Sequence, residues 1–349
     1  MRVVITGATG NVGTSVIPAL AADPAITSIV GLARRRPDLH PDRTEWRVAD
    51  VARDDLTRHF DGADVVVHLA WLFQPTRDPV VTWRANVLGS VRVFEAAARA
   101  GVSAIVYGSS VGAYSPGSKT RPVGEDWPTH GYPGAAYGRE KAYVERVLDT
   151  FERDHPDVRV VRMRPGFVFK REASVEQRRL FGGPLVPERL IRPGRVPVVP
   201  NTPGLRFQVV HGEDAGEAYR LAVVKPVSGA FNIAADPVVE PSVLAELLGA
   251  RLVPVSGWML RGAAAAAWRL RLVPAAPGLV DLVLNMPIMD TARAHAELGW
   301  QPRHTSVDAL RALIEGFREP RGLETPPLSP ETSGPARSGE FAGGMGRRP

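Results

Sequence analysis

The chain is 349 residues long, with 44% apolar and 23% charged residues and a formal net charge of +6. This composition is ordinary for a globular protein with room for one large domain and a smaller one, and it argues against a disordered chain. The absence of cysteine excludes disulfides and thiolate metal sites and fits a reducing cytoplasm, which is the predicted location.

No segment is typical of a targeting signal or a membrane span. The first apolar run ends at Gly7, so it is too short for the apolar core of a signal peptide. The longest apolar stretch, Gly262–Met286, is interrupted by Arg269, Arg271 and Asp281. We predict a buried or interfacial amphipathic helix there and expect no membrane partner.

The first 165 residues alternate short apolar runs with helical periods, which indicates βαβ units. Strands are predicted at Val3–Thr6, Ile29–Leu32, Glu45–Val48, Val65–Leu69, Ala104–Tyr107 and Val158–Met163. Helices are predicted at Val12–Ala22, Ala52–Phe60, Pro79–Ala100 and Ala135–Arg153. The predicted fold is therefore α/β, a Rossmann-like doubly wound parallel sheet in which residues 1–165 bind a dinucleotide.

After Pro165 the pattern loosens into loops rich in proline and glycine. Helices are predicted at Glu213–Val223, Ser242–Leu248 and Ser306–Phe317. We interpret residues 166–319 as a smaller C-terminal substrate-binding lobe, parts of which return to the main sheet. Residues 320–349 lack an apolar period and are predicted to be a disordered tail.

Basic residues concentrate between positions 170 and 195. Seven basic side chains stand there against three acidic ones, Glu172, Glu176 and Glu188. The run is either a solvated basic face or a funnel for an anionic small-molecule substrate. No nucleic-acid recognition motif accompanies it, so nucleic acid is not expected as a partner.

Three glycines at a spacing of three, Gly7, Gly10 and Gly13, stand between the first strand and the first helix. Glycine allows the backbone to turn with positive φ and to approach a pyrophosphate, which the N–H groups at the start of the helix then face. Gly7, Thr9, Gly10, Asn11, Val12 and Gly13 are the predicted contacts to the dinucleotide.

The end of the second predicted strand indicates which dinucleotide is bound. An enzyme that uses NAD usually places an acid there, and this chain has Arg34, Arg35 and Arg36. Guanidinium groups would accommodate a 2′-phosphate, so we favour NADP over NAD, with Arg34 and Arg35 as contacts. The alternative is that these arginines are solvated loop residues. Asp50 and Val51, after the third strand, are expected near the adenine.

Tyr137 and Lys141 lie four residues apart on a predicted helix, and therefore on one face. A phenol with an ordinary pKa near 10 is a poor base at neutral pH, and burial would raise that pKa further. The ammonium and an oxidised nicotinamide ring would lower it, so we expect these charges to prevail if Tyr137 is the acid or base. Lys141 can also donate to the nicotinamide ribose.

The strand Ala104–Tyr107 ends in Gly108, Ser109 and Ser110. A serine hydroxyl at this edge of the sheet can donate a hydrogen bond to a substrate oxygen that becomes charged during hydride transfer. The residues alone do not choose between the two serines.

The chain resembles the extended short-chain dehydrogenase/reductase family, in its NAD-dependent epimerase/dehydratase branch. The resemblance is carried by Thr6–Gly13, Asp50-Val51, His68-Leu69-Ala70, Asn86–Gly89, Ser109–Tyr114, Tyr137 with Lys141, Arg164-Pro165-Gly166 and His211–Ala215. It implies that Ser110 is the active serine, that Asn86 supports the active-site helix and its water, and that Leu69, Ala70, Pro165 and Gly166 contact the dinucleotide. It also implies a homodimer through the helices at Pro79–Ala100 and Ala135–Arg153.

Departures from the family pattern reduce the number of candidate reactions. The acidic pair of sugar-nucleotide dehydratases is missing after Ser110, which disfavours elimination, and the arginine that grips a diphosphate would fall at Phe207, one position from Arg206. An epimerase acting on a sugar nucleotide and an NADPH-dependent reductase or dehydrogenase of a small carbonyl or hydroxyl compound stay open, in that order. A dinucleotide sensor without turnover is the third hypothesis. Substrate contacts are expected from Trp71–Arg84 and Phe167–Arg206, and no metal site is predicted.

Overall fold

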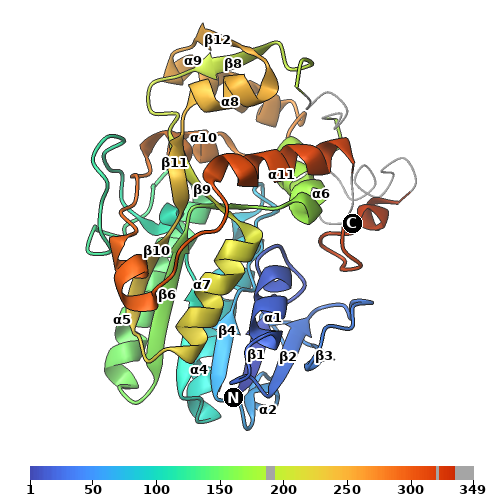
Figure 1. Cartoon of the computed structure of the whole chain (residues 1–349), viewed down its shortest axis with the longest axis vertical. Coiled ribbons are helices and arrows are strands. Elements are labelled where there is room, and N and C mark those ends of the chain that lie inside the picture. The colour runs from blue at the N-terminus through green and yellow to red at the C-terminus, as the bar shows by residue number, and fades with distance from the viewer. Residues whose placement is uncertain (186–192, 320–321, 335–349) are drawn as a thin grey trace.

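The structure is a computed structural model and describes residues 1–185, 193–319 and 322–334. Within them, a seven-stranded parallel sheet in the order β10-β6-β5-β4-β1-β2-β3 forms the centre of the molecule (Figure 1). Its strands are β1 (Arg2–Thr6), β2 (Ser28–Ala33), β3 (Thr44–Val48), β4 (Val65–His68), β5 (Ala104–Gly108), β6 (Arg159–Pro165) and β10 (Gly229–Ile233). The predicted fold class is confirmed.

Helices cover both faces of this sheet because its buried strands alternate side chains between two cores. Val3 and Ile5 of β1 contribute to one core and Val4 to the other. The helices α1 (Gly13–Ala21) and α7 (Gly212–Val224) pack together on the first face, with Leu20 and Ala218 in its core. The second face is covered by α2 (Thr57–Phe60), α4 (Gly89–Arg99) and α5 (Ala136–Asp154).

The register of the sheet brings the carboxyl ends of β1, β4 and β5 together at one edge, where the candidate site lies. Thr6 at the end of β1 lies opposite His68 at the end of β4, and His68 lies opposite Tyr107 on β5. The order of the strands along the chain reverses between β1 and β4. In doubly wound sheets, ligands bind in the crevice outside the carboxyl ends of the strands at such a reversal.

Two small sheets and four helices lie beyond the carboxyl edge of the main sheet, at the upper end in Figure 1. One sheet has the order β11-β9-β7 and the other pairs β12 with β8. Their strands are β7 (Phe167–Phe169), β8 (Val198–Asn201), β9 (Phe207–His211), β11 (Ala235–Val239) and β12 (Arg251–Pro254). The helices are α8 (Pro241–Leu248), α9 (Gly257–Arg269), α10 (Pro277–Asn285) and α11 (Ser306–Arg318). Between β9 and β11, α7 and β10 belong to the main layer, so the chain returns to it there.

Short helices complete the described chain. They are α3 (Pro79–Trp83), η1 (Arg84–Leu88), η2 (Val111–Ala113), η3 (Arg171–Ala173), α6 (Ser174–Gln177), η4 (Arg178–Gly182), η6 (Ala294–Leu298) and η7 (Pro330–Ser333). The helix predicted at Pro79–Ala100 is thus α3 and α4 joined by the π-helical turn η1. Such turns occur mostly as single insertions in α-helices, frequently at functional sites.

Two predicted helices differ from the observed elements. Of Ala52–Phe60 only α2 is helical, because the Asp50 carboxylate accepts the Ala52 N–H and the Asp54 carboxylate accepts the Asp50 N–H, which stabilises turns in its place. The stretch Gly262–Met286 contains parts of two helices, α9 and α10, and Pro277 begins the second.

The expected disordered tail differs from the structure over residues 322–334. Thr325 and Leu328 are buried there, and Arg179 donates to the carbonyl of Pro327. These long-range contacts order a segment whose composition alone predicts disorder. The rest of the predicted tail, residues 320–321 and 335–349, lies outside the described residues.

The basic run is not one solvated face. Lys170 and Arg178 are buried, and Arg171 pairs with Glu319. Arg189 and Arg192 lie outside the described residues. Among the described helices, none combines the length and the apolar character that crossing a bilayer requires.

Candidate active site

A cavity of about 790 Å³ opens at the carboxyl edge of the main sheet, between β1, β4, β5 and the C-terminal elements. All the predicted cofactor contacts line it: Gly7, Thr9, Gly10, Asn11, Val12, Gly13, Arg34, Arg35, Asp50, Val51, Leu69, Ala70, Tyr137, Lys141, Pro165 and Gly166. Ser110 and Asn86 line it as well. The structure therefore places every predicted site residue in the lining of one cavity.

The glycine turn has no room for side chains. Gly7 has φ +70°, and a Cβ there would lie 2.6 Å from the Ala70 nitrogen. A Cβ on Gly13 would lie 2.6 Å from the carbonyl oxygens of Gly7 and Ala8. Beside the turn, the Asn11 amide donates to the Val168 carbonyl while its buried Oδ1 has no hydrogen-bond partner. A glycine turn at the start of a helix fits a dinucleotide pyrophosphate, and the unpaired Asn11 Oδ1 beside it can accept a hydrogen bond from the ribose.

The far end of the cavity is lined by Arg34 and Arg35, at the end of β2, and by Asp50, after β3. The Asp50 side chain accepts the Ala52 N–H, so its position is set by the local turn. Among the described residues of β2 and the loop to Arg36 there is no carboxylate. The charge at this end is suited to a phosphate.

Tyr137 stands in the first turn of α5, where it is half-buried and lines the cavity. A Cβ on Gly112 would lie 2.7 Å from its ring, so glycine is required at position 112 for the phenol to occupy this place. The ring contacts Phe73, at 4.9 Å between centroids, and Trp71, at 5.9 Å. Burial raises the pKa of Tyr137 to about 12, against a hydrogen bond with Ser110 that lowers it.

Lys141 lies one turn further along the same face of α5 and is buried. Its Nζ donates to the Gly108 carbonyl at 2.6 Å and lies 3.4 Å from the centroid of the Trp71 ring. Burial lowers the pKa of Lys141 well below its usual range, while Glu145 and Glu140 raise it. Without a dinucleotide, burial therefore has the larger effect on the pKa of Tyr137. The lowering of this pKa that we expect from the Lys141 ammonium and an oxidised nicotinamide ring is not reached in the protein alone.

The two serines after β5 have different partners. Ser109 Oγ donates to the buried Glu145 carboxylate at 2.6 Å. Ser110 Oγ accepts the Gly112 N–H at 3.0 Å, which begins η2, and it keeps its proton for Tyr137 or a ligand. Only Ser110 thus has a hydroxyl directed to the phenol.

Asn86, inside the π-helical turn η1, holds the loop that carries Trp71. Its Oδ1 accepts the Leu72 N–H at 2.6 Å, and its Nδ2 donates to the Leu72 carbonyl and to Glu140. Glu140 also accepts the Thr82 hydroxyl, and burial raises the pKa of this carboxyl. Asn86 therefore connects the loop after β4 to the helix of Tyr137 and Lys141.

His68 joins elements beneath the site. Its ring nitrogens lie 2.6 Å from Thr6 Oγ1 and 2.8 Å from Ser90 Oγ, and burial lowers its pKa to about 3. The imidazole is therefore neutral at physiological pH. Lys170 similarly connects β7 to the glycine turn region through Thr14 and Ser15.

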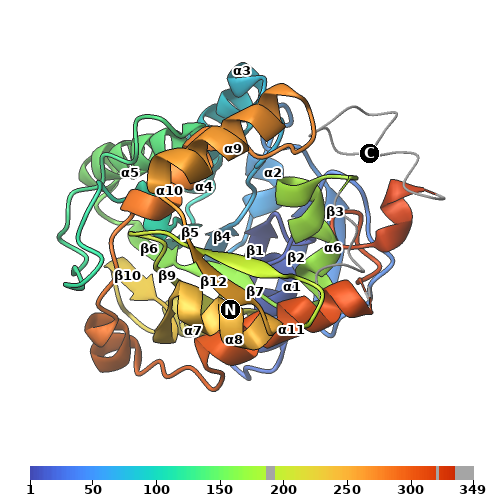
Figure 2. The same cartoon turned by 90° about the horizontal axis from the view of Figure 1, so that it is seen from above.

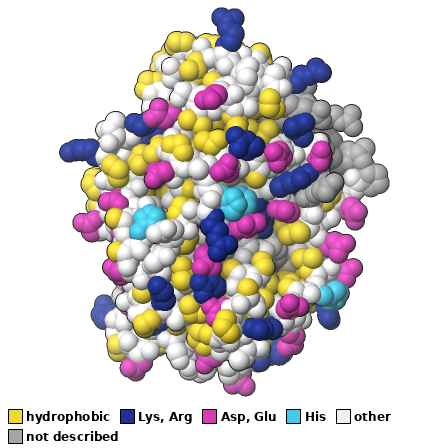
Figure 3. All heavy atoms as spheres, in the orientation of Figure 1, with side chains coloured by type: hydrophobic (Ala, Val, Ile, Leu, Met, Phe, Trp, Pro, Cys, Tyr) yellow, Lys and Arg dark blue, Asp and Glu magenta, His cyan; other side chains and the backbone are white. Residues whose placement is uncertain are grey.

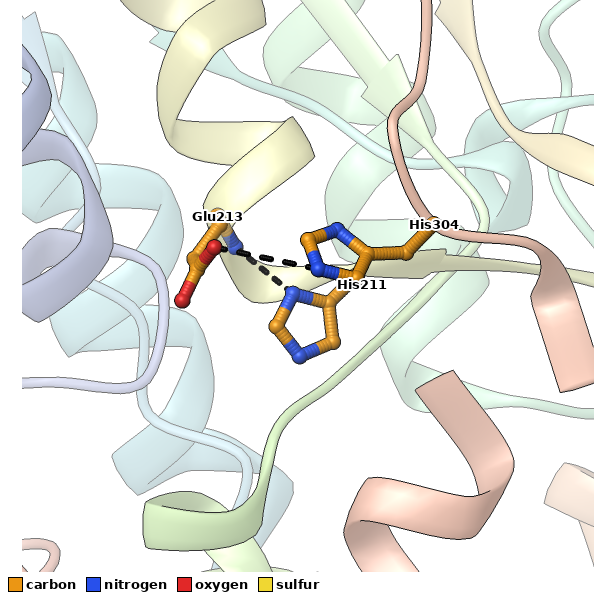
Figure 4. Close-up of side chains that lie close together, drawn as sticks. All are labelled: His211, Glu213 and His304. Atoms are coloured by element: carbon orange, nitrogen blue, oxygen red, sulfur yellow. Dashed lines mark hydrogen bonds and ion pairs between the residues drawn. The ribbon is translucent and has the colours of Figure 1, made fainter. Parts of the chain in front are cut away.

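His211 precedes α7 near Glu213 and His304 and does not line the cavity (Figure 4). The His211 and His304 rings lie 4.1 Å apart, and His211 Nδ1 accepts the Glu213 N–H. The buried Asp214 carboxylate accepts the Arg303 and His304 N–H groups. These contacts anchor the segment before α11 on the start of α7.

The C-terminal elements give the cavity an apolar wall. Apolar side chains of several segments line it: Leu260 of α9, Phe181 and Leu205, Leu279, Val280, Leu282, Val283 and Leu284 of α10, and Leu313 and Phe317 of α11. Glu176 and Arg178 are the charged side chains on this part of the lining among the described residues. Phe207 packs on Phe167, and Arg206 pairs with Glu240 at 2.5 Å. Neither Phe207 nor Arg206 lines the cavity.

Sequence reasoning did not identify three contributors to the site. Trp71, which the sequence places only within the range Trp71–Arg84 expected to contact substrate, contacts both Lys141 and Tyr137. Glu145 follows Lys141 by four residues, so the helical spacing of Tyr137, Lys141 and Glu145 was an available signal. The need for Gly112 depends on the approach of α5 to η2, which no local pattern indicates.

The chain was compared with known proteins. Residues 3–234 match the model of the NAD dependent epimerase/dehydratase family. The UDP-glucose 4-epimerase of Mycolicibacterium smegmatis is 28% identical over 91% of this chain and 99% of its own length. The L-arabinose 1-dehydrogenase (NAD(P)+) of Haloferax volcanii is 31% identical over 48% of this chain and 67% of its own length. The crystal structure of Thermus thermophilus UDP-glucose 4-epimerase with NAD has a TM-score of 0.67 at 20% identity, covering 91% of this chain and 99% of that one. The chain belongs to the NAD-dependent epimerase/dehydratase family.

Proposed function

We propose that the protein is an enzyme that transfers a hydride at a carbinol or ketone carbon, with Tyr137 as the acid or base. The observation that carries this proposal is that Ser110, Tyr137 and Lys141 line the same cavity as the glycine turn. A bound nicotinamide dinucleotide would supply or accept the hydride. Gly7–Gly13 would hold its pyrophosphate, Leu69, Ala70, Pro165 and Gly166 would contact it, and Lys141 would donate to its ribose.

The chain's own residues would handle the substrate oxygen and its proton. Ser110 and Tyr137 would both donate hydrogen bonds to that oxygen, where negative charge develops during reduction. In reduction the phenol proton of Tyr137 would pass to the oxygen; in oxidation a Tyr137 phenolate would take the carbinol proton. Asn86 would act as a positioning residue through Leu72 and Glu140.

Epimerisation of a nucleotide-linked sugar is the first candidate reaction. Support comes from the similarity to a UDP-glucose 4-epimerase over nearly the whole of both chains. In this reaction the carbinol is oxidised, the ketone turns in the cavity, and the hydride returns to its other face. The dinucleotide is unchanged after each turnover.

Net reduction or oxidation of a less polar carbonyl or hydroxyl compound is the second candidate, and one observation favours it. The C-terminal wall is mainly apolar among the described residues, and Arg206 is engaged by Glu240. An apolar wall favours substrates with an apolar body. We further propose NADP as the preferred dinucleotide, because Arg34 and Arg35 come at the end of β2, where doubly wound folds accommodate a 2′-phosphate with an arginine.

Net consumption of dinucleotide separates the two reactions. The purified protein is titrated with NADPH and NADH by fluorescence and then incubated with UDP-glucose or with panels of ketones and aldehydes. Product without a net change in absorbance indicates epimerisation, and stoichiometric loss of NADPH indicates a reductase. Tyr137→Phe should lose turnover by about 10² or more while it still binds the dinucleotide. A fully active Tyr137→Phe variant would show that the proposed mechanism is wrong.

We also propose a homodimer and a cytoplasmic location. Val80, Leu88 and Tyr143 are exposed apolar side chains on α3, η1 and α5, the helices through which the resemblance implies dimerisation. Light scattering of the purified protein tests this: Leu88→Asp with Tyr143→Asp should yield a monomer, and a wild-type monomer at micromolar concentration would contradict it. The dinucleotide pool that the reaction needs is held in the cytoplasm, which a fractionation of the source cells would check.

A further inference from the structure

The outer side of α9 is apolar and basic. Its exposed positions are Trp258, Met259, Arg261, Gly262, Ala263, Ala266, Arg269 and, just after the helix, Leu270. Trp258 is 77% exposed and Leu270 69%, and α9 contributes no buried residue. A helix in contact with water alone normally carries polar residues on its outer face, so this side chain pattern indicates a different environment.

The neighbouring strand has the same character. All four residues of β12 are exposed, among them Leu252 and Val253, and Leu272 after α9 is exposed as well. Figure 1 places α9, β8 and β12 at one end of the molecule, which Figure 2 shows from above, and Figure 3 shows apolar side chains among those exposed at this end. We call the exposed residues of Arg251–Pro254 and Trp258–Leu272 the α9 surface.

The charge on the α9 surface is of one sign. From Leu247 to Val280 the sequence contains four arginines and no acidic residue. Arg261 pairs with Asp281, while Arg251, Arg269 and Arg271 are exposed and form no ion pair with a described residue. The nearest exposed acid along the chain is Glu246 on α8.

We propose that the α9 surface docks the protein onto an anionic lipid bilayer. Interfacial helices bury Trp and Leu side chains at the boundary of headgroups and acyl chains, while Arg side chains attract anionic lipids. The α9 surface supplies both components. Docking needs no spanning helix, so the proposal is compatible with the absence of one among the described helices and goes beyond the expectation of no membrane partner.

The inner side of α9 faces the catalytic cavity. Leu260 lines the cavity, as do Leu279 and Val280 of α10, against which α9 packs. Docking would therefore set the apolar wall of the cavity next to the bilayer. A compound held in the membrane would have a short path to this wall, which goes beyond the proposed hydride transfer and does not depend on it.

Vesicle flotation with the full chain tests the proposal without substrate or dinucleotide. Vesicles of phosphatidylcholine with phosphatidylglycerol should carry the protein upward at low salt, and vesicles of phosphatidylcholine alone should carry far less. Arg251→Gln with Arg269→Gln and Arg271→Gln should weaken binding roughly a hundredfold, because each arginine near an anionic surface contributes about a fivefold factor. Trp258→Ser with Met259→Ser should weaken it by roughly tenfold or more.

A matched control carries the same kinds of change elsewhere. Val48 is 57% exposed on β3, and Arg58, Arg99 and Arg153 are exposed on α2, α4 and α5. Val48→Ser with Arg58→Gln, Arg99→Gln and Arg153→Gln should bind vesicles as the wild type does. NADPH binding and the melting temperature of each variant verify that it is folded.

Three results would overturn the proposal. The first is that the wild type does not bind anionic vesicles at low salt. The second is that the control variant loses as much binding as the variants of the α9 surface. The third is the first result together with light scattering in which Trp258→Ser with Met259→Ser converts a wild-type dimer into a monomer. The last result would assign the α9 surface to a contact between two copies of the chain. A protein that docks but shows no hydride transfer would leave this proposal standing and refute the proposed function.

Discussion

The ammonium of Lys141 lies 3.4 Å from the centroid of the Trp71 ring, and the same indole forms a T-shaped pair with the Tyr137 ring, with centroids 5.9 Å apart. One side chain from the loop after β4 thus contacts both helical residues of the candidate site. A cation over an indole face is stabilised most strongly when it is desolvated, as Lys141 is here. Trp71 therefore favours the charged form of a lysine whose pKa burial lowers.

Replacing Trp71 should reduce catalysis through Lys141. Trp71→Leu removes about 2 kcal/mol of cation–π stabilisation, so kcat/KM should fall by roughly tenfold or more. Trp71→Phe keeps a smaller ring face, and the indole N–H that it removes has no hydrogen-bond partner, so it should retain more activity than Trp71→Leu. Steady-state kinetics of the two variants provide the check, and equal losses in both would indicate that Trp71 serves only as packing.

The pKa of Tyr137 makes a prediction for the free enzyme. Burial raises this pKa to about 12, so the phenol keeps its proton at neutral pH and can donate it to a carbonyl oxygen. Because oxidation needs the phenolate, its kcat/KM should rise with pH below the pKa that Tyr137 has in the complex with oxidised dinucleotide, and reduction should depend little on pH there. Ultraviolet titration of wild type against Tyr137→Phe should reveal no Tyr137 phenolate below about pH 10 without dinucleotide. Phenolate at neutral pH in the free protein would contradict this.

The elements of the main sheet were predictable because each buried strand is a short run of apolar residues that is visible in the sequence. The predicted strands Val3–Thr6, Ile29–Leu32 and Ala104–Tyr107 each differ from β1, β2 and β5 by at most one residue at either end. The pairing of β12 with β8 is different, since all four residues of β12 are exposed and leave no buried period. The π-helical turns likewise keep a helical sequence pattern, so only the structure reveals them.

The candidate site was predictable where its residues lie a few positions apart in the sequence. The spacing of Gly7, Gly10 and Gly13, and of Tyr137 and Lys141, is set within one turn or one helix. The choice of Ser110 over Ser109 rested on resemblance, because the partner of Ser109 is Glu145, 36 residues away. The burial of Lys170 and Arg178 was equally hidden, since each is satisfied by contacts that a charge count does not contain.

Arg34 and Arg35 should determine the choice of dinucleotide. Charge-assisted hydrogen bonds to a phosphate contribute roughly 1.5–3 kcal/mol each, so losing one from each side chain in Arg34→Gln with Arg35→Gln should weaken NADPH binding by about 10²-fold to 10⁴-fold. NADH binding should change little, because NADH lacks the 2′-phosphate. Arg36→Gln is the matched control, since Arg36 is exposed and does not line the cavity. Fluorescence titration measures all three proteins, and equal losses for NADH and NADPH would assign these arginines a general role.

Glu145 should support the stability of the site from below. Its buried carboxylate accepts hydrogen bonds from Ser109, Arg162 and Arg164, and these partners lower its pKa to about 2. Glu145→Gln removes the carboxylate that pairs with the buried Arg164 and leaves Arg162 with Asp149 and Glu152, which should cost about 3–5 kcal/mol in the free energy of unfolding. Glu95→Gln, on the exposed side of α4, should cost less than about 1 kcal/mol. Urea denaturation measures both.

The same contact predicts how stability depends on acid. A carboxyl whose pKa is lower in the folded protein than in the unfolded chain stabilises the fold above the unfolded pKa, and this contribution is lost as the pH falls toward the folded pKa. For Glu145 that window runs from its ordinary value of 4.5 down to about 2. The difference in unfolding free energy between wild type and Glu145→Gln should therefore be constant above about pH 5 and should shrink below pH 4.5. A difference that stays constant down to pH 3 would mean that Glu145 is not held as a carboxylate by Arg162 and Arg164.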